Sequence, residues 1–326
     1  MTVPERAAHD LLVIGANPAI DRYYCLDQLR VGDVNRVTSV RAAAGGKANN
    51  LARAYRRLGG NPITTGIVAG ETGHRILTGL ATEGIAHDYV CTDGESRQTV
   101  TLLAAGATTV LLEPGPLVPE TALDRLVEKV AMLALTVSGV AITGSLPSGA
   151  PGDTVARLVR AARTASSGPI AVDTSGEALR IAALAGPHLI KVNVEEYERA
   201  FGQPADDPAA VEAHVRSLAD HGVEILCLTD GPRGALVLTA QERFAVRTEA
   251  PDPVSTAGAG DAFLAGLLLA LLRGDELTAA ARLASAAAAA ALRQVGAGFI
   301  EPADVDADLS RTRLLDARSF FAEPRP

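Results

Sequence analysis

The stretch Ser255-Thr256-Ala257-Gly258-Ala259-Gly260-Asp261 runs directly into an apolar segment, Ala262-Phe263-Leu264-Ala265-Gly266-Leu267. Its small residues predict a turn that opens a helix, with the carboxylate of Asp261 at the helix start. Backbone N–H groups at a helix start carry partial positive charge and can hold an anion. An aspartate at that place can take a proton from an attacking hydroxyl, so the combination suits phosphoryl transfer to an alcohol. The same residues also fit an ordinary tight turn with an aspartate N-cap.

A second glycine turn lies far upstream, in Ala44-Gly45-Gly46-Lys47-Ala48-Asn49-Asn50-Leu51-Ala52. Residues 36–41 before it alternate like a strand, and the apolar spacing after it predicts a helix that ends at Gly59-Gly60. The two glycines let a ligand approach the backbone, Lys47 supplies a cation, and Asn50 offers a donor and an acceptor to a polyol. The turn lacks the Walker and dinucleotide-binding patterns. A plain glycine turn with a solvated lysine is the alternative interpretation.

Composition narrows the class of protein. With 326 residues, the chain can bury a core in one large domain or two small ones, and without tryptophan that core must come from Ala, Val, Leu and Ile. The net charge of −8 argues against a general nucleic-acid or anionic-membrane surface. Three scattered cysteines indicate reduced thiols in a cytoplasmic protein, and the histidines do not cluster at zinc-ligand spacing. The N-terminus lacks a signal-peptide pattern, and the alanine-rich run 284–292 is too short to span a bilayer.

Short apolar runs alternate with helical patterns along most of the chain. The expected buried strands are residues 11–14, 140–142, 170–172, 189–192 and 225–228, and the expected helices are residues 119–135, 151–165, 194–201 and 208–221. Continuous apolar strands with intervening helices predict a mostly parallel sheet covered on both faces. Ligands of such sheets bind beyond the carboxyl ends of the strands.

Two segments break this alternation. Residues 19–41 and 88–112 contain short alternating strands without a helix between them. We predict that they pair as a small antiparallel sheet that covers the site as a lid. The sequence shows no linker or repeat, so the lid is expected to be a discontinuous part of one domain over residues 1–326.

Polar residues follow the predicted strands. Asp21 comes soon after the first strand and can accept from two sugar hydroxyls, and Ser145 lies in the turn after the strand 140–142. Residues 173–176 after the next strand are expected to support a phosphate region. Each signal has an ordinary alternative, such as a turn aspartate.

The last two predicted strands end in further candidates. Asn193 and Glu196 can hold magnesium through water, or they can serve as a helix cap with a solvated glutamate. Thr229, Gly231 and Gly234 form a turn suited to nucleotide phosphates. Small residues at 286–290 and 296–298 leave a slot for a flat base or indicate tight helix packing, and we favour packing.

These motifs together resemble the PfkB (ribokinase-like) carbohydrate kinases, and within them the 1-phosphofructokinase and tagatose-6-phosphate kinase branch. The shared motifs span nearly the whole chain: Asn17-Pro-Ala-Ile-Asp21, Gly32-Asp-Val-Asn-Arg36, Gly45-Gly-Lys-Ala-Asn-Asn50, Gly70-Glu-Thr-Gly73, Glu113-Pro-Gly115, Gly144-Ser-Leu-Pro147, Asp173-Thr-Ser-Gly-Glu-Ala-Leu179, Asn193-Val-Glu-Glu196 and Ser255-Thr-Ala-Gly-Ala-Gly-Asp261. The resemblance implies a three-layer α/β/α fold with a small β lid, and the use of ATP and Mg²⁺.

The resemblance also implies roles for individual residues. Asp261 matches the catalytic base, and Ala257 to Gly260, including Gly258 and Ala259, match the anion hole. The expected substrate-binding residues are Asp21, Arg36, Gly45, Gly46, Lys47, Asn50, Arg97 and Ser145, with Arg36 and Arg97 on the substrate's phosphate. The expected nucleotide-binding residues are Lys191, Asn193, Thr229, Gly231, Gly234, Ala257, Gly258 and Gly260, and the expected magnesium site is Asn193 and Glu196.

The chain departs from the branch on the predicted lid. Thr99 stands where the branch usually has asparagine, and the run Arg97-Gln98-Thr99-Val100-Thr101 lacks the lysine that often follows soon after. Val110 stands where some phosphofructokinases have arginine. The predicted substrate-phosphate site is therefore less cationic than in the branch.

The resulting expectation is an ATP-dependent kinase of a ketohexose phosphate, first of all one that converts fructose 1-phosphate to fructose 1,6-bisphosphate. Its expected partners are the sugar phosphate and ATP, without nucleic acid or membrane, and with a homodimer formed through the lid. Tagatose 6-phosphate, fructose 6-phosphate or an unphosphorylated sugar or nucleoside are alternative substrates. A sugar- or nucleotide-sensing protein on the same scaffold is the non-enzyme alternative, and a dinucleotide-dependent oxidoreductase is disfavoured by the missing fingerprint.

Overall fold

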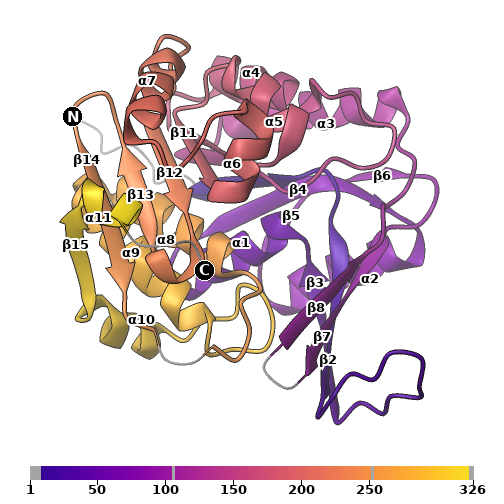
Figure 1. The fold of residues 1–326 in the computed structure, drawn as a ribbon. Helices are drawn as coiled ribbons and strands as arrows, with labels where there is room; N and C mark the ends of the chain where they lie inside the picture. The colour runs from indigo at the N-terminus through magenta and orange to yellow at the C-terminus, as the bar shows by residue number, and fades with distance from the viewer. Residues whose placement is uncertain (1–8, 105–106, 251–252, 323–326) are drawn as a thin grey trace.

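The computed structural model describes residues 9–104, 107–250 and 253–322, and these form two sheets (Figure 1). The main sheet has 11 strands in the order β15-β14-β13-β12-β11-β10-β9-β1-β4-β5, with β6 also paired to β4. Its strands are β1 (Leu11–Gly15), β4 (Pro62–Ala69), β5 (Ala86–His87), β6 (Val90–Thr92), β9 (Gly139–Thr143), β10 (Ile170–Asp173), β11 (Leu189–Asn193), β12 (Ile225–Thr229), β13 (Ala235–Leu238), β14 (Arg243–Thr248) and β15 (Thr312–Asp316).

The centre of the main sheet is parallel, as the apolar runs predict. Strands β4, β1, β9, β10, β11 and β12 pair in parallel, and only β13 to β15 add antiparallel pairs at one edge. Side chains of β1 alternate between two cores: Leu11 and Val13 pack into one, Leu12 and Ile14 into the other. The sheet is therefore buried on both faces.

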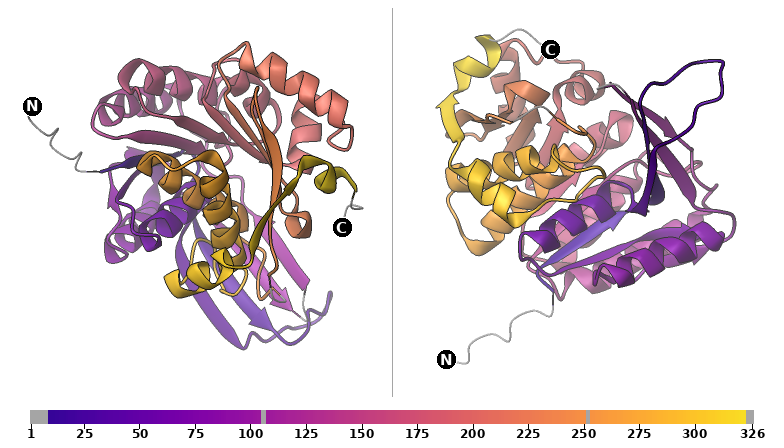
Figure 2. Two further views of the ribbon diagram at one scale, coloured as in Figure 1. Left: turned by 90° about the vertical axis from the view of Figure 1, so that its left-hand side faces the viewer. Right: turned by 90° about the horizontal axis from the view of Figure 1, so that it is seen from below.

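Helices cover both faces of this sheet (Figure 2). One core contains side chains of α1 (Lys47–Arg57), α2 (Gly70–Thr82), α8 (Ala259–Arg273), α9 (Leu277–Ala291) and α10 (Pro302–Leu309). The other contains side chains of α3 (Glu120–Ala134), α4 (Thr154–Ala165), α5 (Gly176–Ala183), α6 (Val194–Phe201), α7 (Pro208–Ala219) and α11 (Ala317–Ala322). The predicted three-layer α/β/α arrangement is confirmed, and none of the helices in the described ranges has the length and hydropathy of a membrane span.

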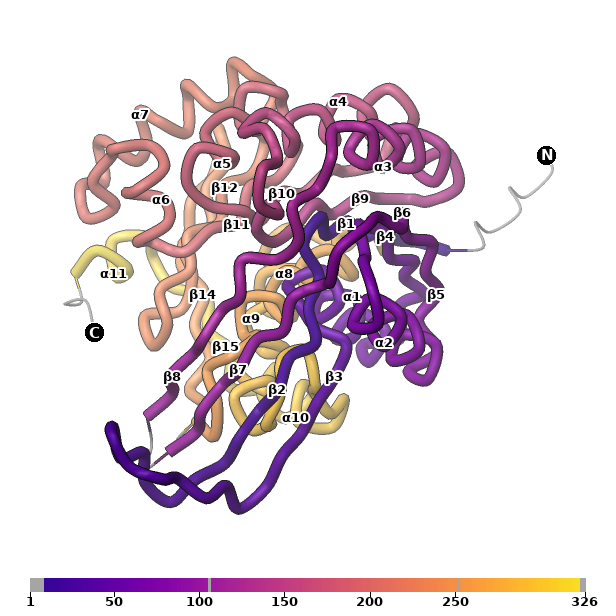
Figure 3. Tube along the Cα trace, turned by 90° about the vertical axis from the view of Figure 1, so that its right-hand side faces the viewer, coloured from indigo at the N-terminus to yellow at the C-terminus, as the bar shows by residue number. Residues whose placement is uncertain are grey.

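Strands β3-β2-β7-β8 form a separate four-stranded sheet that projects from the main body (Figures 1 and 3). These strands are β2 (Ala19–Leu26), β3 (Ser39–Gly45), β7 (Arg97–Ala104) and β8 (Ala107–Leu112). Two side chains of β2, Asp21 and Tyr23, line a cavity between this sheet and the main body, while Arg22 lies on the opposite face.

The small sheet differs from the antiparallel sheet expected from the sequence. Its central pair, β2 with β7, is parallel over eight residues. The reason is the connection: after β3 the chain passes through α1, β4, α2, β5 and β6 before β7 begins, so it re-enters the small sheet in the direction of β2. Within the segment predicted as lid, β6 instead joins the main sheet beside β4. Residues 36–38 are also not a strand, because β3 begins only at Ser39.

Candidate active site

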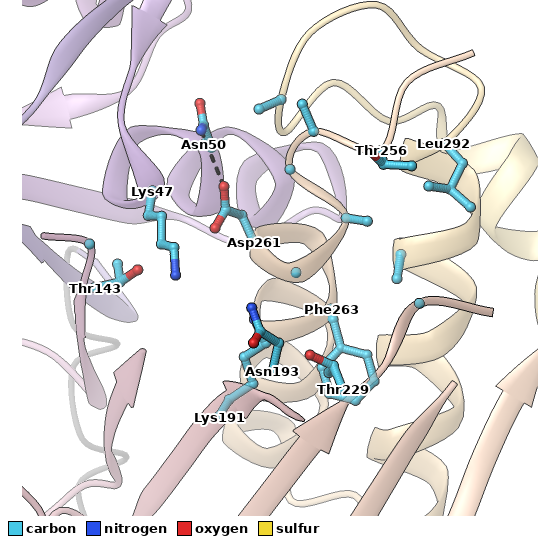
Figure 4. Close-up of a pocket in the computed structure, with 18 of the residues that line it drawn as sticks. Lys47, Asn50, Thr143, Lys191, Asn193, Thr229, Thr256, Asp261, Phe263 and Leu292 are labelled. Atoms are coloured by element: carbon cyan, nitrogen blue, oxygen red, sulfur yellow. Dashed lines mark hydrogen bonds between the residues drawn. The ribbon is translucent and has the colours of Figure 1, made fainter. Parts of the chain in front are cut away.

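A cavity of about 900 Å³ lies where the parallel strands end, between the main body and the small sheet. Thr143, Asn193 and Thr229 end β9, β11 and β12 and line it, as expected for ligand sites in open parallel sheets. The start of α8 and the glycine turn before α1 lie on its opposite side (Figure 4). The cavity therefore collects the two glycine motifs and the strand ends at one place.

The helix α8 begins at Ala259, after Gly258 in the left-handed conformation with φ 83°. Two positions of this turn have no room for a side chain. A Cβ on Gly258 would lie 2.5 Å from the Cβ of Ala297, and a Cβ on Gly260 would lie 2.6 Å from Lys191 Nζ. Within the described part of the chain, the N–H groups of Ala259, Gly260 and Asp261 have no protein acceptor. These amides are free to bind an anion in the cavity.

One amide of the predicted anion hole is engaged. The N–H of Ala257 donates to Ser255 Oγ at 3.2 Å, although Ala257 itself lines the cavity. Among the described residues, the amides at this turn without a protein acceptor are therefore those of Gly258, Ala259, Gly260 and Asp261, so the candidate anion site begins one residue later than the range expected from the sequence. The cause is local, because a serine hydroxyl two residues upstream satisfies the donor.

Asp261 lies at the bottom of this turn and is 6% exposed. Its Oδ2 accepts a hydrogen bond of 3.2 Å from Asn50 Nδ2 (Figure 4). Burial raises the pKa of the Asp261 carboxyl from 3.8 to about 7, and the nearby Lys47 ammonium opposes this rise. A carboxyl with this pKa can accept a proton near neutral pH.

Two lysines approach the same region and share one buried carboxylate. Lys47 Nζ lies 2.7 Å from Asp173 Oδ1, and Lys191 Nζ lies 2.9 Å from Asp173 Oδ2. Burial alone would raise the pKa of Asp173, but Lys191 and Lys47 outweigh it, so the pKa is lowered and the carboxyl is ionised. For Lys47, burial acts to lower the pKa, but Asp173 and Glu196 raise it. Asp173 thus pairs with both cations, and the support of a phosphate region by residues 173–176 stays a prediction.

The small-sheet end of the cavity is lined by Asp21, Thr99, Val110 and Leu112, together with Arg97. Asp21 is held in place: its Oδ1 accepts from Thr99 Oγ1 at 2.7 Å and its Oδ2 accepts from the Gly46 N–H at 3.3 Å. Gly45 does not line the cavity, but a Cβ there would lie 2.1 Å from Asp21 Cγ. Gly45 therefore makes room for the aspartate.

The two arginines expected on a substrate phosphate lie in different places. Arg97 lines the cavity, and its Nε donates to the carbonyl of Asn17 at 3.2 Å. Arg36 is exposed on the loop of residues 27–38, which projects beyond the small sheet, and it does not line the cavity (Figure 3). Ser145 lines the cavity, 3.5 Å from Asn17 Nδ2. Among the described residues, Arg97 is thus the one cation at the small-sheet end.

Asn193 and Glu196 form a capping box at the start of α6. Asn193 Oδ1 accepts from the Glu196 N–H at 2.8 Å, and Glu196 Oε2 accepts from the Asn193 N–H at 3.3 Å. Both side chains line the cavity, and their oxygens retain lone pairs, so they fit a magnesium ion held through water. In the described ranges no group of three or more His, Cys, Asp or Glu could hold a metal directly.

The opposite end of the cavity, the α9 end, is formed by residues that sequence reasoning largely missed. Thr229, Gly231 and Gly234 lie there as predicted. They are joined by Arg247, Thr248, Thr256, Phe263, Ser285, Ala288, Ala289 and Leu292. The helical spacing of residues 285, 288, 289 and 292 could have predicted that they share one face of a helix. In the structure this face of α9 lines the cavity, while Ala286, Ala287 and Ala290 pack in the core. The favoured packing is therefore confirmed for Ala286, Ala287 and Ala290, whereas a slot for a flat base stays a prediction.

Comparisons with known proteins agree with this geometry. Residues 8–304 match the model of the pfkB family carbohydrate kinases. Escherichia coli phosphofructokinase-2 in complex with potassium superposes with a TM-score of 0.85 at 25% identity, over 93% of this chain and 98% of that chain. A possible 1-phosphofructokinase of Thermotoga maritima gives a TM-score of 0.85 at 22% identity, covering 94% and 99%. Arabidopsis thaliana ribokinase complexed with ribose and ATP gives 0.74 at 19%, covering 93% and 99%. The last two show likeness of fold alone.

Proposed function

The chain belongs to the pfkB family of carbohydrate kinases, and from that premise we propose that it transfers a phosphoryl group from ATP to a hydroxyl of a ketohexose phosphate. Fructose 1-phosphate is the first candidate, with fructose 1,6-bisphosphate as the product. The observation that carries the proposal is the buried Asp261 beside the free amides of Ala259 and Gly260, all facing one cavity. A protein that only senses a sugar or nucleotide does not need this base.

In the proposed reaction, Asp261 removes the proton from the sugar hydroxyl as its oxygen attacks the γ-phosphorus of ATP, and the bond from that phosphorus to the bridging β-phosphate oxygen breaks, so that ADP leaves. The amides at the start of α8 and the ammonium of Lys47 stabilise the negative charge on the transferred group. Asp21 accepts hydrogen bonds from sugar hydroxyls at the small-sheet end, while the phosphates and base of the nucleotide occupy the α9 end. Kinases of this family use ATP. Asn193 and Glu196 would hold Mg²⁺ through water, and the ion would supply neutralisation of phosphate charge.

The small sheet has two further proposed roles. It acts as a lid whose closure excludes water, so that the sugar receives the phosphoryl group. Its face away from the cavity carries Tyr24, Val40, Val100, Leu102 and Leu111, by the alternation of side chains along the paired strands. This apolar face supports a homodimer formed through the lid; the E. coli phosphofructokinase-2 has a tetrameric inhibited form.

An unphosphorylated sugar is the second candidate substrate, favoured by the small-sheet end itself. Arg97 is the one cation there among the described residues, and Val110 and Leu112 line the wall beside it. Burial lowers the pKa of Arg97, with Asp21 and Glu113 opposing, but the guanidinium stays charged at neutral pH. One half-buried arginine is enough for a phosphate contact, so the phosphorylated substrate remains the proposal.

A substrate panel tests this choice. Fructose 1-phosphate, fructose 6-phosphate, tagatose 6-phosphate, fructose and ribose are compared by kcat/KM with ATP. We expect fructose 1-phosphate to lead, and we expect Arg97→Gln to raise its KM about 10- to 100-fold, because a hydrogen bond to a charged group is lost. The KM of ATP should not change.

The matched control is Arg243→Gln, an exposed strand arginine paired with Glu212 at 3.0 Å and outside the cavity lining. It should leave both KM values unchanged. Preference for fructose or ribose over every phosphorylated sugar, with no effect of Arg97→Gln, would contradict the assigned substrate class. Absence of any ATP consumption with all five sugars would contradict the enzyme.

A further inference from the structure

Arg53 is a buried arginine on α1 that does not line the cavity, and it is 2% exposed. Its five N–H groups all have acceptors. Nε donates to Glu83 Oε2 at 2.5 Å, one NH1 proton goes to Asn50 Oδ1 at 3.2 Å and the other to Ala297 O at 2.9 Å. NH2 donates to the carbonyl of Ala44 and, at 2.8 Å, to Glu83 Oε1.

This environment sets the orientation of the Asn50 amide. A guanidinium can only donate, so the amide atom that faces Arg53 must be the oxygen. The amide nitrogen then faces the other way, and it donates to Asp261 Oδ2 at 3.2 Å. Without Arg53, only the carboxylate would hold the amide this way round, and a protonated Asp261 could then donate to the turned amide oxygen, which would stabilise the protonated form of the carboxyl.

Arg53 also joins the segments that surround Asp261. Ala44 lies at the end of β3, Glu83 follows the last turn of α2, and Ala297 lies in the turn after α9 that packs against Gly258. The Arg53 guanidinium lies over the ring of Phe299 at 4.4 Å, which fixes that turn further. Lysine has three donors and no planar fork, so it cannot reproduce this set of contacts.

We propose that Arg53 is a positioning residue for the phosphoryl transfer, which acts through Asn50 to hold the Asp261 carboxylate in place and in its proton-accepting form. The inference rests on the proposed role of Asp261 as the base. Arg53 does not line the cavity and lies behind Asn50, one of the predicted sugar-binding residues, so it would act on the reaction without touching either substrate.

The expected signature is a change in the pH profile. Asp261 faces Asn50 and Lys47 from α1, Asp173 from β10 and Lys191 from β11, and Tyr23 of β2 lies close enough for an electrostatic interaction. The Asn50 N–H lowers the pKa of Asp261, against the rise caused by burial. If the amide turns its oxygen toward the carboxylate, that pKa rises, and the acid-side midpoint of kcat/KM moves to higher pH.

The experiment compares Arg53→Lys with the wild-type protein. We expect kcat/KM at pH 7 to fall about 100-fold, because a small misplacement of the base is costly, and the acid-side midpoint to move upward. Arg57→Gln is the control on the same helix, since Arg57 is exposed and pairs with the exposed Glu301 at 3.3 Å. Glu83→Gln is a second variant that keeps an acceptor for Arg53, and we expect a smaller change of the same direction.

A double-mutant cycle separates positioning from stability. In the Asn50→Ala background, Arg53→Lys should cause no further movement of the midpoint, because its effect passes through the missing amide. The proposal is overturned if Arg53→Lys and Glu83→Gln lower activity equally at all pH values, or if the Arg53 effect is the same with and without Asn50. Asp261→Asn distinguishes a failure of the proposed base from a failure of this inference. An active Asp261→Asn variant would contradict the role of Asp261 as the base. An inactive Asp261→Asn variant, together with an Arg53→Lys variant whose pH profile is unchanged, would contradict only the positioning role of Arg53.

Discussion

At the scale of single residues, Asp261 combines two conflicting demands. It must be buried beside the α8 amides to act on a sugar hydroxyl, and burial makes its charged form costly. Asn50, Lys47 and Lys191 oppose that cost in part, with Asn50 as the one hydrogen-bond donor among them. The residue therefore affects turnover and stability in opposite directions.

Replacing Asp261 with Asn should remove the base and keep the shape. We expect turnover to fall about 10²- to 10⁴-fold, the usual contribution of a general base. Steady-state kinetics with ATP and the preferred sugar measure this, and the far-UV circular dichroism spectrum checks the fold. Turnover within a few-fold of the wild type would show that the base has been assigned wrongly.

The same variant should gain stability, more at alkaline than at acid pH. Because the folded pKa is raised from 3.8 to about 7, the stability linked to this carboxyl is fully present below pH 4 and is lost as the pH rises through 7. Above pH 7 the cost of the buried charge is on the order of 4 kcal/mol, which Asn does not carry. Urea unfolding of both proteins at pH 5 and pH 8 tests this; a gain that is equal at both values, or larger at pH 5, contradicts it.

The sequence predicted much of the site at this scale and missed specific contacts. The glycine turns, Asp261, Lys47 and Asn50 follow from local chemistry, so they could be recognised along the chain. The contacts of Arg53 could not, because its acceptors lie between 3 and 244 residues away. The place of Arg36 could not be predicted for a related reason. A motif shows only which residues neighbour Arg36 in the chain, and in the structure the loop of residues 27–38 carries it away from the cavity.

At the scale of elements, the α6 start serves the fold and the proposed magnesium site with the same two side chains. Asn193 and Glu196 satisfy each other's backbone N–H groups in a capping box, worth about 1 kcal/mol of stability. Gln at the third position of a helix caps as Glu does, but it has no charge for a cation. The two roles can therefore be separated by one substitution.

Glu196→Gln should leave the unfolding free energy within about 0.5 kcal/mol of the wild type, since Gln completes the capping box. It should raise the Mg²⁺ concentration needed for half-maximal activity, because the charged oxygen is gone. Asn193→Ala is the companion variant, expected to lose about 1 kcal/mol of stability as well. If Glu196→Gln needs no more Mg²⁺ than the wild type, the proposed magnesium site is wrong and the two residues serve only as a helix cap.

Element prediction succeeded where periodicity was strong and failed where pairing was decided at long range. The helix predicted at 194–201 is α6 without change, and the helix predicted at 119–135 is α3 within one residue at each end. The direction of β7 in the small sheet depends on the path of the chain before it, and the sequence of β7 itself does not determine that path. The same holds for β6, whose short apolar pattern fits either sheet.

At the scale of the whole molecule, the small sheet has one face toward the cavity and one face away from it, and the outer face exposes apolar side chains. Asp21 and Thr99 face the cavity, whereas Val40 and Leu111 are 50% and 57% exposed on the other face. An exposed apolar sheet face of this kind is typical of an interaction surface. Here we propose that a second copy of the chain covers it.

Leu111→Asp should convert the dimer to a monomer, because a buried unpaired charge at the contact costs several kcal/mol. Size-exclusion chromatography with light scattering measures the mass. Leu135→Asp, at the C-terminal end of α3 and 71% exposed, is the control and should leave the mass unchanged. A wild-type protein that is monomeric at all concentrations would contradict the proposed dimer.

The connectivity of the two sheets has a consequence for biosynthesis. Strand β1 is flanked by β4 and β9, and strand β2 by β3 and β7, so residues 11–26 supply an inner strand to each sheet. These residues leave the ribosome before every strand that will flank them. Neither sheet can close around them until β7 and β9 have emerged, so the edges of both strands stay unpaired during this part of translation.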